Sequence, residues 1–256
     1  MVLTDDHVST IEAAVEEGWG FDNLAKFITW ILATNAGQGL VILVAVLLAQ
    51  PLPELPAQAL WINMTTAVLL GLTLAFEPKA PGLMTRPPRT SGAPILAGEL
   101  GVRIVLVGLM LALGAFGLFE WALRHGTSEE AARSVAATVF AVGQSFDLLN
   151  CRPLRWSMFR LEPVSNPWIW AGISAMMLVQ LAFIDLPVMN QLFHTVAIAA
   201  FYWLPILAVG LSIDLVMELE TVYRRRADRR SGVKAASGPG GPVAAREGPK
   251  VSQCPM

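Results

Sequence analysis

Residues 58–89, QALWINMTTAVLLGLTLAFEPKAPGLMTRPPR, join a hydrophobic helix pattern to a basic strip rich in proline. From its start to Phe76 the stretch carries no charge, although Asn63, Thr65 and Thr66 place amide and hydroxyl groups inside it. The prolines that follow remove backbone donors, so a helix cannot continue through them. The stretch therefore predicts a membrane-spanning helix that contains polar groups and ends in a cationic collar.

The composition of the whole chain is typical of a membrane protein. Hydrophobic residues make up 54% of the 256 residues and charged residues only 15%, with a mean hydropathy of +0.55. A helix needs about 20 residues to cross a hydrocarbon core of about 30 Å. Runs without charge that reach or approach this length occur at 27–53, 55–76, 104–119, 163–184 and 195–213. We therefore expect an all-α membrane protein, a bundle of six transmembrane helices.

The six expected spans define the domain organisation. They lie at about 27–49, 57–77, 99–121, 134–151, 167–186 and 195–217, and together they form a transmembrane domain at 27–222. The polar residues 1–26 precede it and contain an amphipathic pattern of helical period. Residues 223–256 form a basic segment followed by a Gly/Pro/Ala-rich tail, which we expect to be disordered.

The distribution of basic residues predicts the orientation. Loops 78–98 and 151–166 hold three Lys/Arg each and the C-terminal region holds eight more, whereas the opposite loops hold Arg124 and Arg133. By the positive-inside rule both termini are cytoplasmic, and the protein is expected to be a multi-pass protein of the cell membrane. The two cysteines, Cys151 and Cys254, do not form a disulfide framework.

Three spans each carry two polar residues three positions apart, which places both on one helix face. These pairs are Asn35 with Gln38, Asn63 with Thr66, and Gln144 with Asp147. Amide, hydroxyl and carboxylate oxygens suit hard cations, and an ionisable group within a span is a functional candidate. The alternative is that these groups only form hydrogen bonds between helices. No phosphate-binding glycine loop, Cys/His metal cluster or nucleophile–base pair is present, so no catalytic or cofactor-binding residue is predicted.

Two motifs in the central stretch closely resemble a known family. LWIN-x-x-T and FEPK-x-PG-x-M-x-RPPR are similar to the sixth transmembrane helix and following loop of P-type cation pumps of the calcium/sodium-pump branch. The similarity extends over about 1–226. It implies that residues 1–26 are the end of the phosphorylation domain and a cytoplasmic stalk helix. It also implies that the six spans are helices five to ten of a ten-helix pump.

The resemblance also suggests site residues. Asn35, Asn63 and Thr66 match cation ligands of the calcium pump, whereas Gln38 and Gln144 stand where that pump has glutamates. Ala67 replaces a central aspartate of the sixth helix. The loss of carboxylates argues against calcium, whose binding depends on ligand charge. A monovalent ion, a proton or another cation is left open, with Asp147 as a further participant.

The DKTGT, TGE and GDG-x-ND motifs of the family do not occur in this sequence. The chain alone is therefore not expected to hydrolyse ATP, and Mg²⁺ and ATP are expected only in other domains of an intact pump. The favoured interpretation is the C-terminal cation-binding membrane part of a P-type ATPase, as a fragment or as half of a split pump whose N-terminal half is a partner. The alternatives are a free-standing channel, a pump-regulating subunit or a non-functional gene remnant.

Overall fold

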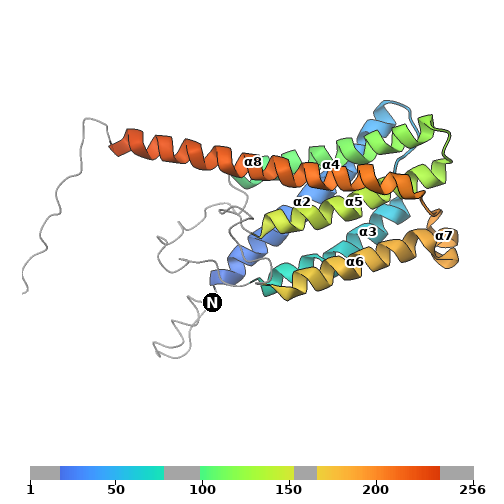
Figure 1. The fold of residues 1–256 in the computed structure, drawn as a ribbon, viewed down its shortest axis with the longest axis horizontal. Helices are drawn as coiled ribbons and strands as arrows, with labels where there is room; N and C mark the ends of the chain where they lie inside the picture. The colour runs from blue at the N-terminus through green and yellow to red at the C-terminus, as the bar shows by residue number, and fades with distance from the viewer. Residues whose placement is uncertain (1–17, 78–98, 153–165, 237–256) are drawn as a thin grey trace, which may run out of the picture.

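The computed structural model describes residues 18–77, 99–152 and 166–236, and within these ranges the chain forms helices and no strands (Figure 1). The elements are α2 (Gly18–Leu47), α3 (Pro56–Leu69), η1 (Gly71–Phe76), α4 (Glu99–Arg124), α5 (Glu129–Cys151), α6 (Pro167–Asp185), α7 (Pro187–Phe193), η4 (Ala200–Tyr202) and α8 (Trp203–Ala236). The expectation of an all-helical membrane protein is confirmed for these residues. Residues 1–17, the basic loop 78–98 and the tail beyond 236 lie outside them.

Five helical segments are long and apolar enough to cross a membrane, by length and composition. They are Asn23–Leu47, Pro56–Phe76, Leu100–Arg124, Pro167–Asp185 and Ala200–Arg224. The expected span at 134–151 corresponds to α5, which is a 23-residue helix but is not among the five. Its side chains are almost all buried from Ser134 to Ser145, so other helices and not lipid surround it. A helix in that position can keep polar residues that a lipid-facing helix cannot.

The ends of the spans differ from the sequence expectation in two places. Residues 18–26 are the first turns of α2, continuous with the first span, and no separate stalk helix is seen in the described residues. The last span begins at Ala200 instead of about 195: His194 adopts a left-handed conformation (φ 52°) at the end of α7, and residues 195–199 are not helical. Helix α8 then continues to Ala236, through the basic segment that the sequence predicts to be part of the tail.

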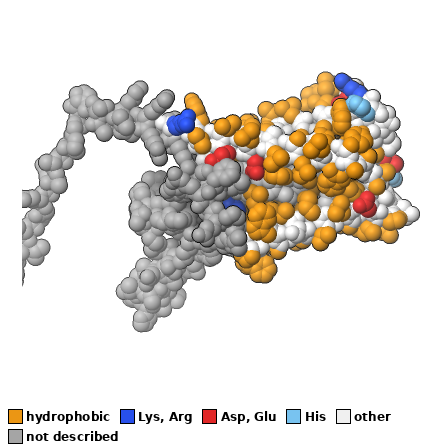
Figure 2. Space-filling model, viewed as in Figure 1, with side chains coloured by type: hydrophobic (Ala, Val, Ile, Leu, Met, Phe, Trp, Pro, Cys, Tyr) orange, Lys and Arg blue, Asp and Glu red, His pale blue; other side chains and the backbone are white. Residues whose placement is uncertain are grey.

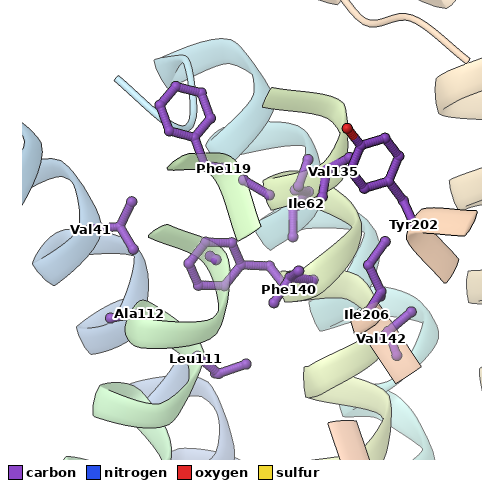
Figure 3. Close-up of a cluster of buried hydrophobic side chains, with 14 of the residues drawn as sticks. Val41, Ile62, Leu111, Ala112, Phe119, Val135, Phe140, Val142, Tyr202 and Ile206 are labelled. Atoms are coloured by element: carbon purple, nitrogen blue, oxygen red, sulfur yellow. The ribbon is translucent and has the colours of Figure 1, made fainter. Parts of the chain in front are cut away.

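A buried apolar cluster holds the helices together around α5. Phe140 of α5 packs among side chains of the neighbouring helices, including Val41 from α2, Leu111 from α4 and Ile206 from α8 (Figure 3). Removal of this apolar surface from lipid is not a driving force, so close packing and buried polar contacts must favour association of the helices. The fold therefore depends on shape complementarity and hydrogen bonds.

The outer surface of the bundle is apolar along most of its length. Figure 2 shows hydrophobic side chains over the visible face, with charged side chains gathered toward the two ends. Exposed leucines and valines lie on every long helix except α5, for example Leu43, Leu60, Val105, Leu178 and Leu211. Such a surface in a soluble monomer would be an association site, whereas in a bilayer it is the lipid contact.

One close helix contact gives a direct test of the packing. Gly172 of α6 lies against the end of α3, where an added Cβ would sit 2.4 Å from the carbonyl oxygen of Leu69. Gly172→Ala should therefore lower the unfolding free energy by about 1–3 kcal/mol, since a backbone atom cannot move aside easily. The matched control is Gly117→Ala, where nothing lies within 4 Å of the added carbon. Thermal unfolding in detergent measures both, and equal midpoints would contradict the packing.

Candidate cation site

The first pair of polar residues is split by the structure. Gln38 is buried on the inner side of α2, whereas Asn35 is exposed on the surface of the same helix. Gln38 Nε2 donates to Glu54 Oε1 over 3.2 Å, and Gln38 Oε1 has no hydrogen-bond partner. Gln38 thus presents a buried, unpartnered oxygen, and Asn35 faces the outside of the described bundle.

Glu54 was not expected at this position, because the sequence places it in a proline-rich turn between two spans. It is fully buried, and its Oε2 makes no hydrogen bond with the described residues. Burial raises the pKa of Glu54 to about 8, and the hydrogen bond from Gln38 offsets only part of that effect. The surroundings of this carboxyl group therefore strongly disfavour an uncompensated negative charge.

The turn reaches Gln38 by folding back along α2. Ala49 adopts a left-handed conformation (φ 51°), and the Gln50 amide donates to the Ala45 carbonyl over 2.9 Å, which reverses the chain. Gln38 lies nine residues before the end of α2, or about 13 Å along the axis. The five residues after Ala49 can cover that length when extended. Glu54 therefore lies inside the bundle.

The second pair lies on α3. Thr66 is buried, and its hydroxyl donates to the Ile62 carbonyl at 2.6 Å, which leaves its lone pairs available. Asn63 is partly buried, and no hydrogen bond of its side chain is found within the described residues. Met64 between them is 61% exposed, so Thr66 lies on the inner side of the helix, Met64 on the lipid side and Asn63 at the border between the two.

The third pair lies on the buried helix α5. Gln144 is fully buried, and neither its amide oxygen nor its amide nitrogen has a partner among the described atoms. Its backbone carbonyl accepts from Trp30 Nε1 at 3.1 Å. Trp30 lies eight residues before Gln38, or about 12 Å along α2, so Gln38 and Gln144 occupy different depths of the bundle. A buried amide without partners is costly for folding and is a candidate ligand.

Asp147 belongs to a charged cluster near the end of α5. Arg103 and Asp214 act on it electrostatically, and the thiol of Cys151 lies 3.9 Å from its Oδ1. Arg103 in turn donates to the Asn150 carbonyl at 3.0 Å, and the Asn150 amide donates to Asp214. The cluster joins α4, α5 and α8. Asp147 thus has local partners, and in the described part of the chain no hydrogen bond joins predicted site residues of different helices; within α3 the Thr66 hydroxyl also donates to the Asn63 carbonyl at 3.4 Å.

A second buried network, also missed by the sequence analysis, ties four segments together at the same end of the bundle. Arg152 Nε donates to Glu77 at 3.0 and 3.2 Å, and both side chains are 4% exposed. Asn166, the N-cap of α6, donates to Glu77 Oε2 at 2.9 Å and to the Thr73 carbonyl at 3.2 Å. Asn23 of α2 donates to the Glu77 carbonyl at 3.1 Å. Glu77 therefore connects the end of η1 to α2, to the end of α5 and to the start of α6.

Comparison with known proteins shows the family to which the chain belongs. Residues 51–223 match the family model described as cation transporting ATPase, C-terminus. The chain is 50% identical over 226 residues to the probable cation-transporting ATPase F of Mycobacterium tuberculosis, a match that covers 88% of this chain and 25% of that protein.

Two further relatives agree with this assignment. The cation-transporting ATPase pma1 of a Synechocystis strain is 38% identical over 202 residues, covering 76% of this chain and 22% of the relative. The calcium-transporting ATPase of Bacillus subtilis is 32% identical over 214 residues, covering 83% and 24%. The chain spans about a quarter of the length of these relatives. The family resemblance of the motifs at 58–89 is confirmed, and the protein belongs to the family of C-terminal membrane domains of P-type cation-transporting ATPases.

Proposed function

We propose that this domain binds the transported cation of a P-type pump through Asn35, Gln38, Asn63, Thr66, Gln144 and Asp147. The observation that carries the proposal is that two of these residues, Gln38 and Gln144, have buried amide oxygens without a partner within the described bundle. Buried polar atoms are normally satisfied, so atoms left open in an apolar bundle are suited to a ligand that arrives during function.

The proposed topology has six spans, with α5 as the fourth, and both termini on the cytoplasmic side of the cell membrane. Figure 1 places the beginning of α2 and the end of α8 at the same end of the bundle, which supports an even number of crossings. The basic residues near that end of the described chain, including Lys26, Arg103, Arg152 and Arg224, support its cytoplasmic assignment by the positive-inside rule.

The proposed ligand set favours a cation of low charge. Five of its six members are neutral amides or hydroxyls, and the sixth, Asp147, lies close to Arg103. Calcium sites gain affinity from several carboxylates, so this set is better suited to a monovalent ion or to weak divalent binding. Mg²⁺ and ATP would be handled by other domains of the pump, with α2 transmitting their movement to Gln38.

A chimeric pump tests the proposal. The matching 226-residue region of the Mycobacterium tuberculosis ATPase F is replaced by this chain, and phosphoenzyme formation from ATP is measured with Na⁺, K⁺, Ca²⁺ and Mn²⁺ in turn. We expect phosphorylation that requires at least one of these cations, because occupation of the membrane site triggers the reaction in the rest of the pump. Phosphorylation with no dependence on any cation would contradict the proposal.

The isolated chain provides the complementary measurement. Liposomes that contain this chain alone should take up none of the four cations, since a site without its motor domains does not alternate between the two sides. Rapid passive uptake would instead favour the channel alternative. The readout is isotope or fluorescent-indicator uptake, with empty liposomes as the control.

A further inference from the structure

We propose that Glu54 and Gln38 form a cation subsite, in which a hard cation is held by Glu54 Oε2 and Gln38 Oε1. The inference deepens the proposed function and rests on it, because it adds a carboxylate ligand to a site otherwise made of neutral oxygens. No sequence pattern or family match assigns a role to Glu54.

The first argument is the state of the two side chains. Gln38 is 4% exposed and Glu54 is not exposed at all, and the 3.2 Å hydrogen bond between them uses one atom of each. The remaining oxygen of each side chain is an acceptor without a donor. The hydrogen bond keeps the two side chains together, and a cation bound by both open oxygens would satisfy them and compensate the charge of the carboxylate.

The second argument is the absence of a protein cation at this carboxylate. Arg133 is the basic residue that contacts the returning segment, but its Nε donates to the Leu52 carbonyl at 3.0 Å and its Nη2 pairs with Glu129. No ion pair of Glu54 is found among the described residues. A buried carboxylate is normally paired with a basic side chain or coordinates a metal, and here the first arrangement is not present.

The third argument is the chemistry of the segment itself. Pro51, Pro53 and Pro56 flank Glu54 and contribute no N–H groups. A segment poor in donors cannot satisfy the carboxylate with backbone amides, as a helix N-terminus or a nest would. The open Oε2 of Glu54 agrees with this lack of backbone donors.

The position of the pair indicates what the subsite does. Glu54 is carried by the segment that links α2 to α3, at the end of the bundle opposite the start of α2. The pair is fully covered, so a cation bound there is occluded until this segment moves. The subsite thus lies between the deeper candidate ligands and the extracytoplasmic side of the proposed topology, where it would hold the ion before release.

The test uses the full chain in lipid nanodiscs, with Na⁺, K⁺, Ca²⁺ and Mn²⁺ as separate probes. Binding is measured by isothermal titration calorimetry and by the cation-dependent rise of Tm. We expect saturable binding of at least one cation by the unchanged chain, and binding that is at least about tenfold weaker in Glu54→Gln, because the affinity of oxygen sites follows ligand charge. Asp185→Asn, which neutralises an exposed carboxylate at the same end of the bundle, should bind as the unchanged chain does.

The exchange variant Q38E/E54Q separates a ligand from a structural residue. It keeps one amide, one carboxylate and their hydrogen bond, with the two groups in each other's place. If the pair binds the cation, the exchange should restore affinity to within about threefold of the unchanged chain, because charge and ligand count are preserved.

Three results would overturn the inference: no cation bound by the unchanged chain, full affinity in Glu54→Gln, or an exchange variant as weak as Glu54→Gln. The proposed function is judged separately by the chimera. Cation-dependent phosphorylation that persists in a chimera carrying Glu54→Gln, with unchanged affinity, would remove this subsite and leave the function intact.

Discussion

Arg152→Gln is expected to lower the unfolding free energy of this domain by about 3–5 kcal/mol, because it leaves the Glu77 carboxylate buried without its cation. The two side chains are only 4% exposed, and the Arg152–Glu77 pair is held by two N–O contacts of 3.0 and 3.2 Å. In such surroundings the loss of one partner costs more than the pair itself contributes, since water cannot replace the missing charge.

The expected loss is large also because Glu77 connects several elements. Its carboxylate accepts a hydrogen bond from the side chain of Asn166 at the start of α6. Its backbone carbonyl accepts one from the side chain of Asn23 in α2. Disturbing Glu77 should therefore loosen the contact of η1 with both helices. The measurement is thermal or denaturant unfolding of the purified chain in detergent, followed by circular dichroism.

Two variants serve as controls for Arg152→Gln. Arg124→Gln removes an arginine whose side chain is 79% exposed and lies 3.8 Å from Glu120, so it should change stability by at most about 1 kcal/mol. The double variant R152M/E77M removes both charges and should recover much of the loss, since replacing a buried pair by apolar residues is often neutral. An Arg152→Gln midpoint equal to that of Arg124→Gln would show that the pair does not stabilise the domain.

The helices of this domain were predictable from the sequence because the bilayer imposes a simple requirement on them. Long uncharged runs mark the spans, and α6 at Pro167–Asp185 agrees closely with the expected 167–186. The expected fourth span at about 134–151 is the one without a long uncharged run, and the structure explains why. Helix α5 is enclosed by the other helices, so its composition is not constrained by contact with lipid.

The residues that the sequence analysis missed depend on contacts between distant positions. Glu77 and Arg152 are 75 residues apart, and each looks like an ordinary interfacial charge in the sequence. Glu54 looked like a loop residue, because nothing in the sequence indicates that the chain reverses at Ala49 and returns alongside α2. A left-handed residue that is not glycine carries no clear sequence signal. The buried polar residues of the spans were found because polarity within an apolar run is visible locally.

Asn63→Ala should abolish cation-dependent phosphorylation of the chimeric pump at cation concentrations that saturate the unsubstituted chimera. Asn63 offers an amide oxygen on a partly buried position of α3, one turn from the buried hydroxyl of Thr66. Alanine removes the oxygen without adding volume or charge, and loss of a direct ligand should lower cation affinity by about 100-fold or more, beyond the 10–100-fold typical of outer-shell changes.

The neighbouring residue provides the matched control for Asn63→Ala. Met64→Ala changes a side chain that is 61% exposed on the lipid side of the same helix turn, and it should leave the cation affinity of phosphorylation unchanged. Equal Tm values for the two variants would show that the difference arises in the site and not in the fold. Unchanged affinity in Asn63→Ala would remove Asn63 from the ligand set and leave the cation to the unpartnered oxygens of Gln38 and Gln144, which share no hydrogen bond with it.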